Sequence, residues 1–315
     1  MIKRPLVSIC VPVYGVENFI ERCARSLLSQ TYPNLEFIFV NDNTQDKSIE
    51  ILKSVIADFP EKEQKTRIVN HKSNRGLSAS RNTALINAKG DYVMHVDSDD
   101  WIDSRAVELL VDELENDDFD IVTGQVIMHK KDFWTILDRP HYYNKIGFVC
   151  DLSKATLRHT IWGRLIKRSL YVDNKVMAEE GTNIGEDLQV MPQLAYYAKK
   201  TSSIESVIYH YNCTNESSYT GSGISTKRLK QDLRSAEIVY DFFCGKEPIF
   251  FETIKKTLLM FYISALRHSA TENNESLFKE VKTKMYKIKP NTVKEKINYL
   301  IAKNYYLYRC LLKIL

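Results

Sequence analysis

The sequence lacks the signals that mark membrane-spanning, secreted and zinc-stabilised proteins. It contains no run of about 18 apolar residues, so we expect no transmembrane helix. Residues 1–5 lead directly into a strand-like stretch, without the apolar segment and small-residue cleavage site of a signal peptide. The six cysteines are scattered and form no Cys-x-x-Cys pair, which argues against a disulfide framework or a zinc site. These absences predict a cytoplasmic protein with reduced thiols.

No internal repeat or low-complexity linker divides the chain. Its 315 residues suffice for one large α/β domain with additions or for two small domains, and 44% hydrophobic residues can fill a sizeable core. The net charge of +4 is unevenly distributed, because residues 221–315 hold 18 Lys and Arg against 9 Asp and Glu. Residues 1–220 hold 26 against 31. We therefore expect the chemistry in the acidic part and an association surface in the basic part.

Predicted strands alternate with predicted helices over the first 124 residues. The strands are expected at residues 6–13, 36–40, 67–69, 92–96 and 120–123. A helix over residues 77–88, ended by Gly90, is typical of the segments between them. This alternation predicts an α/β fold with a mostly parallel sheet and helices on both faces. Residues 130–219 are less regular and rich in aromatic side chains, and the chain from residue 225 onward has a helical, lysine-rich pattern.

Polar residues follow the predicted strands, and the sharpest group is Asp97-Ser98-Asp99. In an open parallel sheet, ligands bind beyond the carboxyl ends of the strands. In an extended segment, residues two apart point the same way, so Asp97 and Asp99 are expected to face one spot. Their repulsion there favours a bound cation, and Mg²⁺ or Mn²⁺ would offset the charge on a departing diphosphate. An acid-x-acid triplet is also typical of a solvated turn or a helix cap, the role that residues 100–103 would then have.

At this point the chain resembles the inverting glycosyltransferases of family 2, which have the GT-A fold and build bacterial surface polysaccharides. The resemblance rests on VSICVPVY, SLLSQTYPNLEFIFVND, NRGLSASRN and HVDSDD, in matching order and spacing, at residues 7–14, 26–42, 74–82 and 95–100. It continues more weakly through residues 161–170 and 185–191. The implied architecture is a GT-A catalytic domain over residues 1–220, with a helical C-terminal region over residues 221–315. Its nucleotide-sugar-binding half would span residues 1–124 and its acceptor-binding half residues 125–220.

The resemblance implies where the nucleoside of the donor lies. Pro12 and Tyr14 would border it, and Asp42 would hydrogen-bond its base or ribose. Relatives commonly use UDP-sugars, so a UDP-sugar is the expected donor. Asn43 and Thr44 depart from the Gly-Ser usual in the family, which puts the shape of that loop in question.

The resemblance also implies roles around the diphosphate. Gly76 would permit a close turn, and Arg81 would offer its guanidinium to phosphate or to the acidic cluster, although it could merely pair with an acid. Asp97 and Ser98 would lie near the ribose and the sugar. Asp99, with Asp97, would ligate Mn²⁺ or Mg²⁺.

An inverting transfer needs a base that takes the proton of the acceptor hydroxyl. The family match assigns this role to Asp187, with Glu186 in reserve and residues 179–180 as more distant candidates. The competing interpretation is structural, because an acid at a helix start is favoured by capping and by the helix dipole.

Two aromatic segments have weaker predictions. Trp162 would stack on an acceptor sugar ring, with a buried core position as the alternative. His210, within Tyr209-His210-Tyr211, resembles a segment that closes over the site in relatives, and it is a third candidate metal ligand. A histidine between aromatic residues can equally be structural.

The basic segment over residues 279–315 carries ten Lys and Arg among tyrosines and leucines. This pattern is typical of an amphipathic helix on an anionic membrane surface, and it also fits a helix packed on the catalytic domain. We expect a glycan or lipid-linked glycan acceptor and peripheral association with the inner membrane surface, rather than nucleic-acid binding.

Two other functions compete with glycosyl transfer. A sugar-nucleotide pyrophosphorylase can share this layout, but it usually carries a Gly-rich phosphate loop after the first strand, which residues 11–18 lack. A non-catalytic carbohydrate-binding protein is disfavoured because the candidate acids are present.

Overall fold

The computed structural model describes residues 4–137, 145–154, 159–215 and 225–290, together with 296, 297, 299, 300, 302, 303 and 305. Contacts between residues divide the chain into two compact units, Met1–Ser222 and Gly223–Leu315. Each unit is described by itself below.

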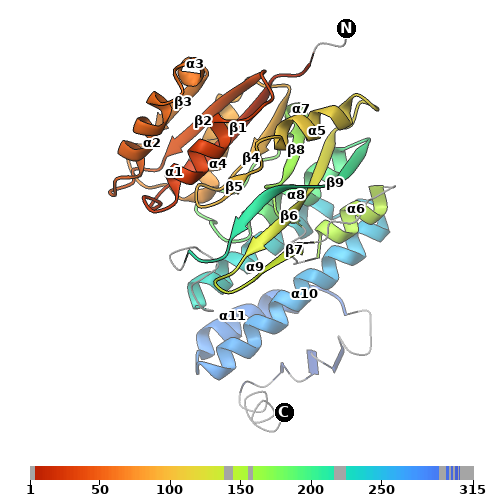
Figure 1. The fold of residues 1–315 in the computed structure, drawn as a ribbon. Coiled ribbons are helices and arrows are strands. Elements are labelled where there is room, and N and C mark those ends of the chain that lie inside the picture. The colour runs from red at the N-terminus through yellow and green to blue at the C-terminus, as the bar shows by residue number, and fades with distance from the viewer. Residues whose placement is uncertain are drawn as a thin grey trace. The chain divides into compact units, whose positions relative to one another are not determined.

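The first unit is built on one mixed sheet (Figure 1). Its strands are β1 (Val7–Val13), β2 (Leu35–Asn41), β3 (Thr66–Asn70), β4 (Tyr92–His95), β5 (Trp101–Ile102), β6 (Ile121–His129), β7 (Trp134–Leu137), β8 (Arg164–Lys167) and β9 (Thr201–Asn212). They lie in the order β3-β2-β1-β4-β8-β6-β9-β5, and β7 pairs with β6.

The expected parallel arrangement holds for only half of this sheet. β1 pairs in parallel with β2 and β4, and β2 pairs in parallel with β3. β8 then runs antiparallel to both β4 and β6, and β5 runs antiparallel to β9. The prediction of an α/β fold is therefore correct. Beyond β4 the sheet is mixed, because β6 pairs in parallel with β9 whereas β8, β7 and β5 run antiparallel to their neighbours.

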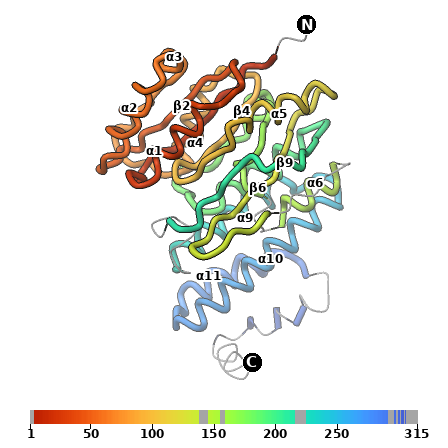
Figure 2. Tube along the Cα trace, in the orientation of Figure 1, coloured from red at the N-terminus to blue at the C-terminus, as the bar shows by residue number. Residues whose placement is uncertain are grey.

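Helices cover both faces of the parallel half. The first unit contains the helices α1 (Ile20–Leu28), α2 (Ser48–Ala57), α3 (Pro60–Glu63), α4 (Leu77–Asn87), α5 (Ala106–Leu114), α6 (Lys145–Leu152), α7 (Arg168–Asn174) and α8 (Glu186–Tyr197). Alternate residues of β1 pack with α1, α2 and α5 in one apolar cluster. α4 contacts β1 and β2 but lies outside that cluster, so it covers the opposite face. Figures 1 and 2 show α2 beside the edge of the sheet.

The end of α4 differs from the sequence prediction. Its C-cap is Ala88 rather than Gly90. Gly90 instead lies against β1, where an added Cβ would come within 2.7 Å of the Ser8 backbone nitrogen. The Glu36 carboxylate holds this turn by accepting the backbone N–H groups of Lys89 and Gly90 at 2.6 and 3.1 Å. The glycine is therefore required by close packing and not by helix termination.

The second unit is helical, as the sequence pattern predicts. It contains α9 (Thr226–Phe243), α10 (Pro248–Thr271) and α11 (Glu275–Met285), and α10 and α11 lie side by side (Figures 1 and 2). α11 covers the start of the predicted basic amphipathic segment, whereas residues 306–315 lie outside the described residues. In the described part of the chain, no helix has the length and apolar character needed to cross a bilayer.

The structure forms no disulfide among Cys10, Cys23, Cys150, Cys213 and Cys244, whose side chains it describes. Cys310 lies outside the described residues.

Candidate active site

A cavity of about 510 Å³ opens beyond the ends of β1, β2 and β4. Residues from both predicted halves of the first unit line it, including β1, the turn after β4, α4 and the start of α8. Ten of the predicted site residues lie on its wall: Pro12, Tyr14, Asp42, Arg81, Asp97, Ser98, Asp99, Trp162, Glu186 and Asp187. Gly76 and His210 are not among the lining residues.

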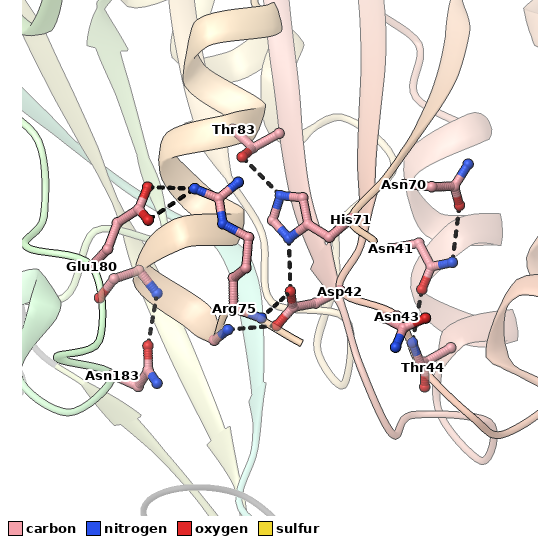
Figure 3. A network of polar contacts seen from close by, with 12 residues as sticks. Asn41, Asp42, Asn43, Thr44, Asn70, His71, Arg75, Thr83, Glu180 and Asn183 are labelled. Atoms are coloured by element: carbon pink, nitrogen blue, oxygen red, sulfur yellow. Dashed lines mark hydrogen bonds and ion pairs between the residues drawn. The ribbon is translucent and has the colours of Figure 1, made fainter. Parts of the chain in front are cut away.

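Asp42 holds the loop that precedes α4 (Figure 3). Its buried carboxylate accepts the backbone N–H of Arg75 at 2.8 Å and that of Gly76 at 2.7 Å. The ring nitrogen Nδ1 of His71 lies 2.7 Å from the same carboxylate, and Nε2 of His71 lies 2.8 Å from the Thr83 hydroxyl. The carboxylate therefore fixes the 75–76 loop while it also faces the cavity.

The conformation of the loop after β2 explains how Asn43 and Thr44 can replace the Gly-Ser pair that is usual in the family. Asn43 adopts a left-handed conformation with φ of 58°, which glycine favours and which asparagine tolerates better than most residues. The Thr44 hydroxyl donates to Asp46 at 2.7 Å and accepts the backbone N–H of Gly15 at 2.9 Å. Asn43 and Thr44 thus provide the backbone shape and the polar contact that a Gly-Ser pair could supply.

Gly76 is required at its position by two independent constraints. Its φ of +88° is strained for any residue with a side chain. An added Cβ would also approach within 2.2 Å of the Asn183 side-chain amide. The side-chain oxygen Oδ1 of Asn183 accepts the backbone N–H of Ser78, at the start of α4, at 3.3 Å (Figure 3). The predicted close turn at Gly76 is therefore present.

One arginine bridges three acids at the centre of the site. Arg81, on α4, donates from Nη2 to Asp97 at 2.6 Å and from Nη1 to Glu186 at 2.6 Å and Asp187 at 2.5 Å. Burial by itself lowers the pKa of Arg81, but Asp187, Asp97 and Glu186 together raise it well above its usual value. The guanidinium is therefore a permanent cation held between the end of β4 and the start of α8.

The two acids at the start of α8 have different environments. Burial, followed by repulsion from Asp187, raises the pKa of Glu186 to about 8, although Arg81 opposes this shift. Glu186 therefore loses its proton less readily than an exposed glutamate does. Within the described chain, the N-cap of α8 is Gly185 and no side chain caps it. The Asp187 carboxylate meets Arg81, and the capping explanation for Asp187 is not supported by this geometry.

The acidic triplet forms a turn instead of the extended segment expected from the sequence. β4 ends at His95, and the backbone N–H of Asp100 donates to the carbonyl oxygen of Asp97 at 3.0 Å. The prediction that alternation along a strand aligns Asp97 and Asp99 is therefore wrong. The turn nevertheless brings both to the cavity wall.

Asp100 has a structural role that differs from the predicted helix cap. Its fully buried carboxylate accepts the Tyr209 hydroxyl at 2.6 Å and the backbone N–H of Asn212 at 2.7 Å. Burial, with Asp99 and Asp97 nearby, raises its pKa well above the usual range. Asp103 is the residue near α5 that accepts a backbone N–H, from Arg105 at 3.0 Å. Asp100 thus ties the acidic turn to β9.

Asp97 and Asp99 are the described residues that best fit a divalent ion. Burial and repulsion from Asp97 raise the pKa of Asp99. A bound cation would stabilise the ionised carboxylate and so oppose this rise. The Asp99 carboxylate accepts the side-chain N–H of Asn215 at 2.8 Å, which orients it. The described residues contain no group of three or more His, Cys, Asp or Glu suited to a metal. Two carboxylates are sufficient when substrate phosphates and water supply the other ligands, as is common for Mg²⁺.

Trp162 and His210 lie on opposite sides of β9. Trp162 is 3% exposed and stacks on Tyr209 at 4.9 Å and on Tyr211 at 5.1 Å, yet it reaches the cavity wall. His210 stacks on Trp101, with ring centroids 5.0 Å apart, and its Nδ1 lies 3.0 Å from Nε2 of His129. Because side chains alternate along a strand, His210 points away from the face that carries Tyr209 and Tyr211. The structure thus places it apart from Asp97 and Asp99.

Sequence reasoning gave no role to His71, Asn183 or Asn215, which contact Asp42, the start of α4 and Asp99 respectively. His71 follows a predicted strand, which was the only signal that could have marked it. Asn183 and Asn215 come from irregular segments, so their positions depend on tertiary packing. These three residues extend the predicted site.

Comparison with known proteins identifies the family of the chain. The Glycosyl transferase family 2 model matches residues 8–173. The uncharacterized glycosyltransferase EpsJ of Bacillus subtilis is 32% identical over 215 residues, which span 66% of this chain and 61% of that protein. The chain thus matches less than two thirds of the length of this relative.

Two solved structures have a similar fold. Residues 1–349 of S. aureus TarS in complex with UDP-GlcNAc align with a TM-score of 0.63 and 17% identity, covering 94% of this chain and 79% of that one. The mannosyltransferase PcManGT of Pyrobaculum calidifontis, in complex with GDP-Man and Mn²⁺, aligns with a TM-score of 0.55 and 18% identity, covering 98% and 87%. The matched family model, the GT-A-type fold and the order of the motifs together show that the chain belongs to glycosyl transferase family 2.

Proposed function

We propose that this glycosyltransferase moves a sugar, with inversion, from a UDP-sugar to an acceptor hydroxyl. The observation that carries the proposal is the arrangement in one cavity of two neighbouring carboxylates, Asp97 and Asp99, and a separate carboxylate, Asp187. Asp97 and Asp99 suit the leaving diphosphate, and Asp187 suits the attacking hydroxyl. An inverting displacement needs both functions on opposite sides of the anomeric carbon.

The donor would enter with its nucleoside along β1 and β2. Pro12 is buried and Tyr14 is 52% exposed at the cavity wall, so Tyr14 offers a free aromatic surface to the nucleoside. Asp42 retains lone pairs toward the cavity beyond those used by the 75–76 loop. UDP-GlcNAc in S. aureus TarS supports a uridine nucleotide, whereas GDP-Man in PcManGT is the alternative that the test must separate.

Asp97 and Asp99 would hold Mn²⁺ or Mg²⁺ together with the donor diphosphate. When bound, such an ion stabilises negative charge that develops on the leaving nucleotide. Mn²⁺ in the PcManGT complex supports this assignment. Arg81 already contacts Asp97, and its fixed positive charge lies beside the expected position of the diphosphate.

Asp187 would act as the base toward the acceptor hydroxyl. Burial raises the pKa of Glu186, so this acid ionises less readily, which favours the neighbouring Asp187 for the role of base. The proton would move from the acceptor oxygen to the Asp187 carboxylate as that oxygen forms the new glycosidic bond. Trp162 borders this side of the cavity and would limit the position of the acceptor ring.

The acceptor in this proposal is a glycan or lipid-linked glycan, in the synthesis of a surface polysaccharide. The family resemblance and the basic residues of α11 support it, because lysines favour an anionic membrane surface. Peripheral membrane association is part of the same proposal.

Incubation with a panel of nucleotide sugars in Mn²⁺, followed by measurement of nucleotide release and product linkage, tests the proposal. We expect turnover with a UDP-sugar and a product of inverted anomeric configuration. Release from GDP-sugars alone, or a retained configuration, would contradict it. Formation of a nucleotide sugar from a nucleoside triphosphate would instead support a pyrophosphorylase.

A further inference from the structure

A second, smaller pocket lies against the residues that form the centre of the site. Its volume is about 20 Å³, and Arg81, Glu186 and Asp187 line it as they line the large cavity. Its remaining polar wall comes from Asn82, on α4, His95, at the end of β4, and Tyr171, on α7. The rings of His95 and Tyr171 meet edge to face, with centroids 6.1 Å apart.

Four polar side-chain atoms around this pocket are buried and unpaired. The hydroxyl of Tyr171, both ring nitrogens of His95 and the Nε of Arg81 have no hydrogen-bond partner among the described residues. Tyr171 and His95 are each 2% exposed, and Arg81 is 5% exposed. Buried polar atoms are seldom left unpaired, because each one costs about 1–3 kcal/mol. Their gathering around one pocket indicates a shared partner.

The pocket has the size and chemistry for one water molecule. A site for water needs roughly 10–15 Å³ and two to four polar partners. A water there can accept the Nε–H of Arg81 and exchange hydrogen bonds with the Tyr171 hydroxyl and with one ring nitrogen of His95. We propose that a buried water in this pocket links Tyr171 and His95 to Arg81, so that both act as positioning residues for the arginine that holds Asp187.

The water would complete the anchoring of the guanidinium. Nη1 and Nη2 of Arg81 already meet Glu186, Asp187 and Asp97, and a bond at Nε would engage the third nitrogen of the guanidinium. A fixed guanidinium plane holds the Asp187 carboxylate in one orientation relative to the acceptor. The proposal of a buried water is independent of the activity of the protein. The proposed effect of Tyr171 and His95 on catalysis rests on the proposed function.

Tyr171→Phe tests the inference because it removes one oxygen and keeps the ring. If that hydroxyl has no partner, its removal leaves stability unchanged or raises it. If it binds the water, the melting temperature falls by about 2–4 °C. The kcat falls about 10-fold, the factor that corresponds to one hydrogen bond, while the KM for the donor stays the same.

Tyr32→Phe is the matched control. Tyr32 is fully buried and donates its hydroxyl to the carbonyl oxygen of Pro5 at 2.6 Å, and it is absent from the walls of both pockets. This variant should lower the melting temperature and leave kcat unchanged. An unchanged or higher melting temperature for Tyr171→Phe would overturn the water site, and a lower one with normal kcat would overturn the positioning role.

A high-resolution crystal structure supplies an independent readout. We expect ordered density about 3 Å from both Arg81 Nε and the Tyr171 hydroxyl. Its absence there would overturn the inference even if the enzyme transfers sugar normally. Wild-type turnover, measured in the same preparations, reports separately on the proposed function.

Discussion

The carboxylate of Asp42 receives the backbone N–H of Gly76 at 2.7 Å, so one acid links the end of β2 to the start of α4. The same side chain faces the cavity proposed to hold the donor. Loop fixation and ligand binding therefore depend on a single residue. Experiments must separate these two effects.

We predict that Asp42→Asn weakens UDP binding by about 1–3 kcal/mol, the usual cost of losing a charged hydrogen bond. Calorimetry of UDP binding measures the change. Glu36→Gln is the matched control, because Glu36 holds the 89–90 turn at the opposite end of β2 in a similar way. Both variants should melt at lower temperature, but only Asp42→Asn should lose affinity. Equal UDP affinity in the two variants would exclude a role for Asp42 in binding.

Asp187→Asn should lower kcat by on the order of 10²–10⁴-fold and leave the dissociation constant of UDP nearly unchanged. The reason is that a base contributes in the transition state and not in the donor complex. Glu186→Gln, one residue earlier, is the control and should keep most of the activity, because glutamine resembles a protonated glutamate. Kinetics with the acceptor saturating measure both variants. The reverse ranking would move the role of base to Glu186.

The raised pKa of Glu186 predicts a pH-dependent stability. The folded protein binds a proton at Glu186 with a pKa of about 8, whereas the ordinary value is 4.5. Folding therefore takes up a proton between these values, and the stabilisation present below pH 4.5 is lost as the pH rises toward 8. Thermal melting from pH 5 to 9 should show a steeper decline for the wild type than for Glu186→Gln. If the melting temperatures of the two proteins decline in parallel with pH, the pKa of Glu186 is not raised in the folded protein.

Asp99→Ala should abolish the effect of Mn²⁺ on UDP affinity. The wild type should bind UDP more tightly in Mn²⁺ than in EDTA, whereas the variant should show one weak affinity in both, as measured by calorimetry. Asp103→Asn is a suitable control, since Asp103 lies outside the lining residues and asparagine accepts the same backbone bond. A wild type that binds equally well in EDTA would remove the metal from the proposal.

The predictable part of the fold is the part determined by local pattern. β1, β2 and α4 lie close to their expected residues because alternation, apolar runs and turn residues are local signals. The sequence does not predict β9, a strand of 12 residues, because its sequence lacks regular alternation and its pairing with β6 is distant in sequence. The reversal at β8 likewise depends on partners more than 40 residues away.

The candidate site likewise has features that local motifs predict and features that depend on the folded structure. The motifs identified the acids and Arg81, but they could not indicate that Arg81 contacts three carboxylates at once. They also gave the wrong reason for the proximity of Asp97 and Asp99, which comes from a turn closed by Asp100. His210 was selected from its neighbours in the sequence, yet strand alternation directs it to the other face of β9.

Arg81 connects segments that lie more than 100 residues apart, because it joins α4 to the acids at the start of α8. This contact constrains how such enzymes can exchange parts during evolution or in the laboratory. A chimera that joins residues 1–124 of this chain to the second half of a relative would leave a buried cation or buried anions unmatched unless the relative supplies equivalent acids. A change on one side of this contact therefore requires a compensating change on the other side.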